Sequence, residues 1–108
     1  MSYGGGNGFN NLMRQAQKMQ QEMLKRKEAV GVKEFEGTAG GGMVTAKVNG
    51  NKAILAIKIE ASVIDPKDAE MLQDMIVAAL NQALQKADEA MKAALSEVTG
   101  GVGIPGMM

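Results

Sequence analysis

The sequence contains no cysteine and no histidine, and these two absences exclude the commonest kinds of metal site and of acid–base catalysis. Without cysteine there is neither a disulfide framework nor a thiolate metal site. Without histidine, the chain lacks the commonest metal ligand and the only side chain whose unperturbed pKa lies near neutral pH. Any nucleophile would be a serine or threonine, and none lies in a recognisable activating motif. We therefore expect a protein that is not an enzyme, with no cofactor, no metal and no small-molecule substrate.

Long apolar runs and aromatic side chains are also scarce. No apolar run approaches the ~20 residues that a membrane span needs, and the N-terminus lacks the charged and then apolar pattern of a signal peptide. We therefore expect a cytoplasmic protein without a membrane partner. The 108 residues correspond to one domain by length. Because only 3% of the residues are aromatic, aliphatic side chains and the ten methionines must build the core.

The first periodic segment runs from about Phe9 to Ala29, after a glycine-rich stretch at residues 1–8 that we expect to be a flexible leader. Apolar residues recur at spacings of three, four and seven, which places them on one face of a helix. These residues are Leu12, Ala16, Met19, Met23 and Val30. Arg14, Lys18 and Lys25 fall on the opposite face, within an arc of roughly 60°. The segment therefore predicts an amphipathic helix with a basic outer face.

Three segments with strand character follow this helix. They are Val32–Thr38, Met43–Val48 and Lys52–Ile59. In the second, apolar and polar residues alternate, which is typical of a half-buried strand. Three glycines, Gly40–Gly42, connect the first two segments, and Asn49-Gly50 connects the second to the third. Because both Asn49 and Gly50 tolerate positive φ, the pair predicts a two-residue type I′ hairpin turn. The sequence thus predicts a three-stranded antiparallel sheet.

A second helix begins at Asp65-Pro66 and ends before Gly100-Gly101. Asp65 suits the helix cap and Pro66 suits the first helical position. The cluster of Asp65, Asp68 and Glu70 has the spacing of a helix start and lacks that of a calcium loop, so we interpret it as capping. Residues 100–108 are expected to form a flexible tail, which leaves 9–99 as the folded domain.

The length of the second helix has a consequence for assembly. About thirty residues span roughly 45–50 Å, more than the ~30 Å width of a small domain. A sheet of short strands can cover only part of the apolar stripe of such a helix. The rest needs another helix, most simply from a second copy. We therefore expect a homodimer with projecting helical arms.

The net charge is zero, but the charges are distributed unevenly. Residues 1–60 hold nine basic and five acidic side chains, a balance of +4, whereas residues 61–108 hold three and seven, a balance of −4. The basic excess lies largely in the first helix. A basic stripe of this kind is either a solvated helix face or a surface for phosphates, whose counterions lysine and arginine release on binding. Charge alone leaves both interpretations open.

Four segments together resemble the YbaB/EbfC family of nucleoid-associated proteins. They are residues 11–20, 41–50, 65–83 and 99–106, which are spread over nearly the whole chain in the family's order. The resemblance implies a tweezers-shaped homodimer of helix–three strands–helix protomers, an α+β fold. It also implies binding of duplex DNA through the helical arms, a location in the nucleoid and the absence of catalysis.

The resemblance implies a set of candidate DNA-binding residues on the two helices. They are Arg14, Lys18, Lys25, Arg26, Lys27, Lys86 and Lys92. Arg26 and Lys27 flank the apolar stripe, so each either contacts DNA or packs its stem at the dimer interface. The predicted function is that of a non-enzymatic nucleoid-associated protein with a role in nucleoid organisation and gene regulation. The alternative is a dimeric adaptor that binds another protein through its amphipathic helices.

Overall fold

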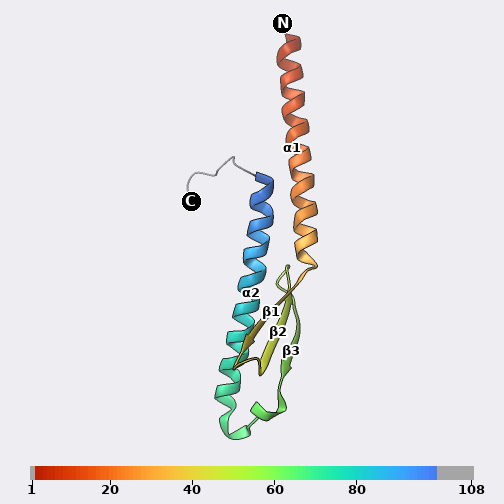
Figure 1. The fold of residues 1–108 in the computed structure, drawn as a ribbon. Helices are drawn as coiled ribbons and strands as arrows, with labels where there is room; N and C mark the ends of the chain where they lie inside the picture. Colours follow the sequence, from red (N-terminus) through yellow and green to blue (C-terminus); the bar gives the residue numbers. More distant parts are fainter. Residues whose placement is uncertain (1, 100–108) are drawn as a thin grey trace.

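A computed structural model describes residues 2–99, with side chains from residue 8 to residue 97 (Figure 1). Along the chain, two long helices flank three strands that form a small sheet, with two short 3-10 turns between the sheet and the second helix. The elements are α1 (Ser2–Gly31), β1 (Glu34–Ala39), β2 (Val44–Asn49), β3 (Ile54–Ile59), η1 (Ala61–Val63), η2 (Pro66–Asp68) and α2 (Ala69–Thr99). This order confirms the predicted fold class of helix, three-stranded antiparallel sheet and long helix.

The sheet is a meander with the strand order β1-β2-β3, and α2 packs across β1 and β2. Alternation along β2 directs three side chains toward α2, and all three are fully buried. They are Val44, Ala46 and Val48. On α2, alanines spaced four residues apart form a ridge of small side chains on one face. They are Ala79, Ala83 and Ala87, also fully buried. Small side chains on both elements therefore bring the helix unusually close to the sheet.

The closest approach occurs at Gly37 in β1. A Cβ atom at this position would lie 2.5 Å from the backbone nitrogen of Ala83 and closer still to the carbonyl oxygen of Ala79. Only glycine leaves room for the backbone of α2 here, so its role is close approach and not backbone flexibility. The amide of the next residue, Thr38, donates a hydrogen bond of 2.7 Å to Oε1 of Gln82, which joins β1 to the same turn of α2.

The predicted two-residue turn between β2 and β3 is wrong. The residue with positive φ is Lys52 (67°), and Gly50 does not have one. The amide of Lys52 donates to the carbonyl of Asn49 at 2.9 Å, and Oδ1 of Asn49 accepts from the amides of Asn51 and Ala53. The side chain of Asn49 therefore stabilises a wider loop, of the kind in which a turn is followed by one left-handed residue. Gly50 is needed for a different reason, because a Cβ there would lie 2.5 Å from the carbonyl carbon of Val30.

The start of the second helix agrees with the sequence. Asp65 has an extended backbone, and its Oδ1 accepts a hydrogen bond of 2.9 Å from the amide of Lys67. This confirms Asp65 as a cap. Pro66 opens the 3-10 turn η2, which leads directly into α2 at Ala69. The first turn therefore tightens before the α-helical hydrogen bonding begins.

The first helix differs from the prediction at its beginning. α1 begins at Ser2 and not at Phe9, so residues 2–8 of the expected flexible leader are helical in the structure. Each added residue gains one backbone hydrogen bond once a helix exists, which offsets the entropic cost of the glycines. Residue 1 and residues 100–108, the expected flexible tail, lie outside the described residues.

The length argument for a second copy also needs correction. The last turns of α2, after Asp88, extend beyond the sheet, and their neighbour there is α1 of the same chain (Figure 1). Val30 at the end of α1 is buried and Met23 is half-buried. The C-terminal part of the α2 stripe therefore has α1 of the same chain beside it, while Ala90 and Ala94 stay half-buried.

Candidate nucleic-acid interface

The feature that distinguishes this molecule is an arm formed by α1. Its C-terminal part packs against α2, whereas its N-terminal part extends beyond the end of α2 (Figure 1). The ion pair between Arg26 of α1 and Glu97 of α2 joins the two helices near that end. The whole structure is 81 Å long but only 26 Å and 16 Å in its other dimensions. A rod of this shape offers helix surface to a long partner.

The basic face of the arm is exposed to solvent. Arg14, Lys18 and Lys25 are exposed and lie on the side opposite the apolar stripe, so their charges point into solvent. Together they extend along roughly 16 Å of helix axis. None of the side chains described between residues 8 and 97 forms an ion pair with these three cations. They are available to a partner of opposite charge.

The two cations that flank the apolar stripe differ from each other. The guanidinium of Arg26 pairs with the carboxylate of Glu97, and the side chain of Arg26 is partly covered. Lys27 is exposed, and no described side chain pairs with it. Arg26 therefore has an intrachain partner on α2, in an exposed ion pair of the kind that contributes little to stability. Periodicity could not reveal Glu97 as its partner, because the two residues are 71 positions apart in the sequence.

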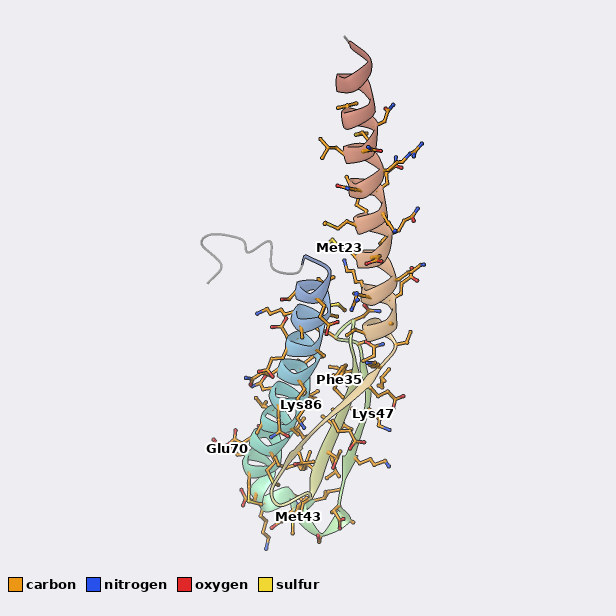
Figure 2. The ribbon with its side chains drawn as sticks, turned by 45° about the horizontal axis from the view of Figure 1, so that its top comes forward. Met23, Phe35, Met43, Lys47, Glu70 and Lys86 are labelled. Atoms are coloured by element: carbon orange, nitrogen blue, oxygen red, sulfur yellow. The ribbon has the colours of Figure 1, made fainter. Side chains whose placement is uncertain are left out.

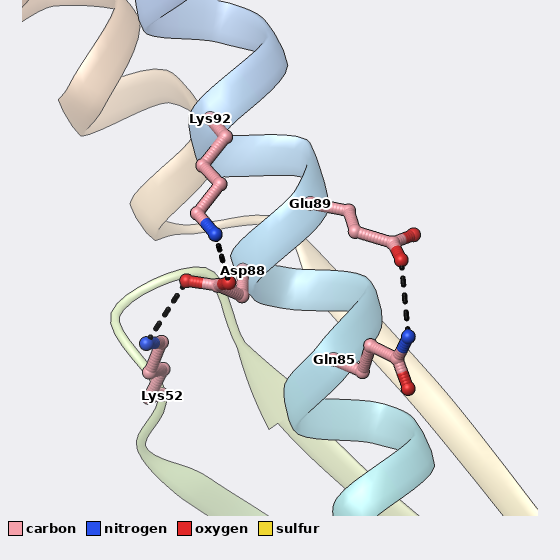
Figure 3. A network of polar contacts seen from close by, with 5 residues as sticks. All are labelled: Lys52, Gln85, Asp88, Glu89 and Lys92. Atoms are coloured by element: carbon pink, nitrogen blue, oxygen red, sulfur yellow. Dashed lines mark hydrogen bonds and ion pairs between the residues drawn. The ribbon is translucent and has the colours of Figure 1, made fainter. Parts of the chain in front are cut away.

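The candidates on α2 are held by neighbours in the same chain. Nζ of Lys86 donates to the backbone carbonyl of Glu36 in β1 at 2.9 Å. Lys92 contacts Asp88 at 3.1 Å, and Lys52 from the hairpin loop reaches the other carboxylate oxygen of Asp88 at the same distance (Figure 3). Lys86 and Lys92 lie on a helix whose other charged residues are all acidic. They are less available to phosphates than the cations of α1.

The same cluster affects the acidity of Asp88. Hydrogen bonds from Lys92 and Lys52, together with their positive charges, hold the pKa of this carboxyl below its ordinary value of 3.8. Asp88 therefore stays ionised at neutral pH and ties the β2–β3 loop to α2. Its role is structural.

The strands carry fewer unpaired cations than the arm, because of their two lysines, Lys47 and Lys58, only Lys58 forms no ion pair with a described side chain. Lys47, on the face of β2 away from α2 (Figure 2), lies 3.3 Å from Glu34 and 3.8 Å from Glu36 across the β1–β2 pair. These acids neutralise it. Between residues 8 and 97, no group of three or more acidic residues is arranged to hold a metal ion. Within the described part of the chain, no helix is long and apolar enough to cross a membrane.

The fold and its exposed basic face define a class of small α+β proteins with a projecting cationic helix. The chain matches the model of the YbaB/EbfC DNA-binding family over residues 5–102. It belongs to that family. The resemblance described in the sequence analysis is thereby confirmed over nearly its whole extent.

Named relatives agree with this assignment. A nucleoid-associated protein of Clostridium novyi is 57% identical over 104 residues, which cover 96% of this chain and 91% of the relative. A nucleoid-associated protein of Alkaliphilus metalliredigens is 48% identical, again over 96% of this chain and 91% of the relative. Among solved structures, an uncharacterized protein of Helicobacter pylori has a TM-score of 0.61 at 26% identity, covering 72% of this chain and 90% of that one. The description of the family names DNA binding.

Proposed function

We propose that this protein binds duplex DNA by placing the basic face of α1 along the phosphate backbone. The observation that carries the proposal is the set of three exposed and unpaired cations, Arg14, Lys18 and Lys25, on the outer face of a projecting helix. Charges that no carboxylate neutralises can exchange their counterions for phosphates. Lys27 adds to this surface at its flank, whereas Arg26, Lys86 and Lys92 contribute less because each has an intrachain partner.

This surface supports binding that is independent of sequence. Lysine and arginine side chains on the phosphate backbone fix position but read no bases. The acidic excess of α2 repels DNA, so the arm approaches the duplex from the side of α1. With a net charge of zero and few cations per protomer, affinity is modest and depends strongly on salt. The protein acts without catalysis at the nucleoid, in the cytoplasm. There it takes part in nucleoid organisation and gene regulation.

A homodimer would double the basic face, and β3 supplies a surface for it. β3 is an edge strand, and α2 does not cover it. Ile54 and Ile57 share the face of the core residues Val48 and Ala46, with which they pair, yet they are 56% and 38% exposed. The bulged residue Leu55 is exposed as well. The one charge of β3, Lys58, lies on the opposite face, and an otherwise apolar edge strand is a template for pairing with another copy. We propose that two protomers meet at β3, with their arms free.

A protein–protein adaptor is the second candidate, because the arm also exposes apolar residues. Leu12 and Met19 lie on the α1 face opposite the cations and are exposed. Apolar docking and phosphate binding respond oppositely to salt, since only the latter releases counterions. A fluorescence-anisotropy titration of a random duplex, at low and at near-physiological salt, separates the two. DNA binding predicts affinity that falls steeply between these conditions. Absence of binding at low salt would refute it and leave the adaptor.

A further inference from the structure

One face of α1 is apolar over most of the helix, but α2 lies beside only part of it. Near the C-terminal end of α1, Val30 is buried and Met23 is half-buried where α1 packs against α2. Further toward the N-terminus, Met19 is 42%, Leu12 is 65% and Phe9 is 63% exposed. Figure 2 shows Met23 at about the level where α2 ends. The apolar face therefore continues beyond α2, exposed to solvent.

This apolar face has the spacing of a coiled coil. Two series of residues, each with a period of seven, make it up. One series is Phe9, Ala16, Met23 and Val30, and the other is Leu12 and Met19. The second series follows the first by three residues, which is the spacing of the a and d positions of a heptad repeat. A face with this spacing packs along a second helix, because each apolar side chain inserts between side chains of the other helix.

We propose that the arm of a second copy covers the exposed part of this face, with the two α1 helices antiparallel. In this register Phe9 of one copy lies opposite Met19 of the other, and Leu12 lies opposite Ala16. The first pair sets a thioether against an aromatic ring, and the second sets a large side chain against a small one. Because the arrangement is two-fold symmetric, each pair occurs twice, along about 15 Å of helix axis. The exposed face is thus complementary to itself.

The direction and the charges of the arm favour this occupant. α2 runs antiparallel to α1 where the two helices pack (Figure 1). An antiparallel second arm would therefore continue the packing of α2 on the same face of α1. Between residues 9 and 19 the only charged side chains are Arg14 and Lys18, and both lie on the opposite face. No like charges meet when two copies bring these apolar faces together.

The size of the contact makes the pairing weak in free solution. Two helices that meet over about 15 Å bury less than the roughly 1,600 Å² of a standard protein interface. The pairing leaves the two basic faces open and directs them away from each other. With DNA bound there, one pair of arms would hold a duplex on each side, a consequence that rests on the proposed function. Binding along DNA would also raise the local concentration of the arms and strengthen their pairing.

Cysteine cross-linking tests the pairing in the absence of DNA, because the chain has no native cysteine. Two full-length variants, Phe9→Cys and Met19→Cys, would be mixed in equal amounts at high protein concentration and oxidised mildly. Mass spectrometry would then quantify the three possible disulfide dimers, with circular dichroism to show that both variants fold. The same mixture would be repeated with Leu12→Glu added to both variants, and again with Leu24→Glu as the matched control. Leu24 is 58% exposed but lies about 100° around the helix from the apolar face.

The proposal predicts that the mixed disulfide, between a Phe9→Cys copy and a Met19→Cys copy, forms roughly tenfold more often than either disulfide between identical variants. Leu12→Glu should remove this preference, whereas Leu24→Glu should retain it. Disulfides in purely statistical proportion would overturn the proposal. An excess of disulfides between identical variants would also overturn it, because the arms would then be parallel. Since no DNA is present, failure of the pairing and failure of the proposed DNA binding are separate results.

Discussion

Replacement of Gly37 by alanine tests the close packing between the sheet and α2. The added Cβ would lie 2.5 Å from the backbone nitrogen of Ala83, whereas ordinary contact begins at 3.4 Å, a shortfall of 0.9 Å. The obstructing atoms belong to a helix backbone and cannot rotate away. β1 must therefore move outward by about an ångström and loosen the buried layer of Val44 and Ala46. Such overpacking costs about 3 kcal/mol at the upper end of the usual range.

Thermal unfolding followed by circular dichroism measures this effect. For a protein of about 100 residues, 1 kcal/mol corresponds to roughly 4–8 °C, so Tm should fall by about 12–24 °C. The matched control is Gly8→Ala, where an added Cβ meets nothing within 4 Å. Alanine favours a helix more than glycine does, so the control should leave Tm unchanged or raise it. Protein concentration must be equal, because dimerisation affects Tm. A Gly37→Ala protein with the Tm of the unmodified protein would refute the reasoning.

Three further predictions follow from exposed residues. Ile57→Lys places a charge on the apolar face of β3 and should weaken dimerisation on the order of a hundredfold by analytical ultracentrifugation; an unchanged dissociation constant would move the interface elsewhere. Arg26→Ala removes the exposed pair with Glu97 and should cost under about 1 kcal/mol in urea unfolding; a larger loss would mean that the pair holds the arm. Asp88→Asn should lower Tm slightly at pH 7. Because the pKa of Asp88 in the folded protein lies below its ordinary value, the ionised carboxylate stabilises the fold at pH values above 3.8. This stabilisation is lost as the pH falls through the lowered pKa, so the variant should match the unmodified protein well below pH 3.8. A difference that persists there would contradict this.

The elements of the fold could be predicted because each has a local signal. Alternation in β2 and the cap at Asp65 placed the strand and the second helix close to their observed bounds. The hairpin loop could not be predicted, because the local pair Asn49-Gly50 is typical of a tight two-residue turn. Gly50 is instead required by the close approach of Val30, which lies on another element. Gly37 is a similar case. Its importance depends on a helix that follows it by some forty residues in the sequence.

The candidate site shows the same limit. Helical rotation alone indicated that Arg14 and Lys18 share an exposed face, and the structure has both exposed. Rotation could not show that Arg26 pairs with Glu97 or that Lys86 donates to β1, because these partners lie on other elements. It also could not show that α1 covers part of α2, the finding that shifts the proposed dimer surface to β3.

The most direct test of the proposed function compares two double variants that each lose two positive charges. Arg14→Ala/Lys18→Ala alters the basic face of α1, whereas Lys33→Ala/Lys67→Ala removes exposed lysines elsewhere. The quantity measured is the slope of log affinity against log salt for one random duplex. Each phosphate contact contributes about 0.9 to that slope. The account predicts a slope smaller by about 1.8 for each bound protomer in the first variant and a nearly unchanged slope in the second. Equal slopes in the two variants would contradict the account.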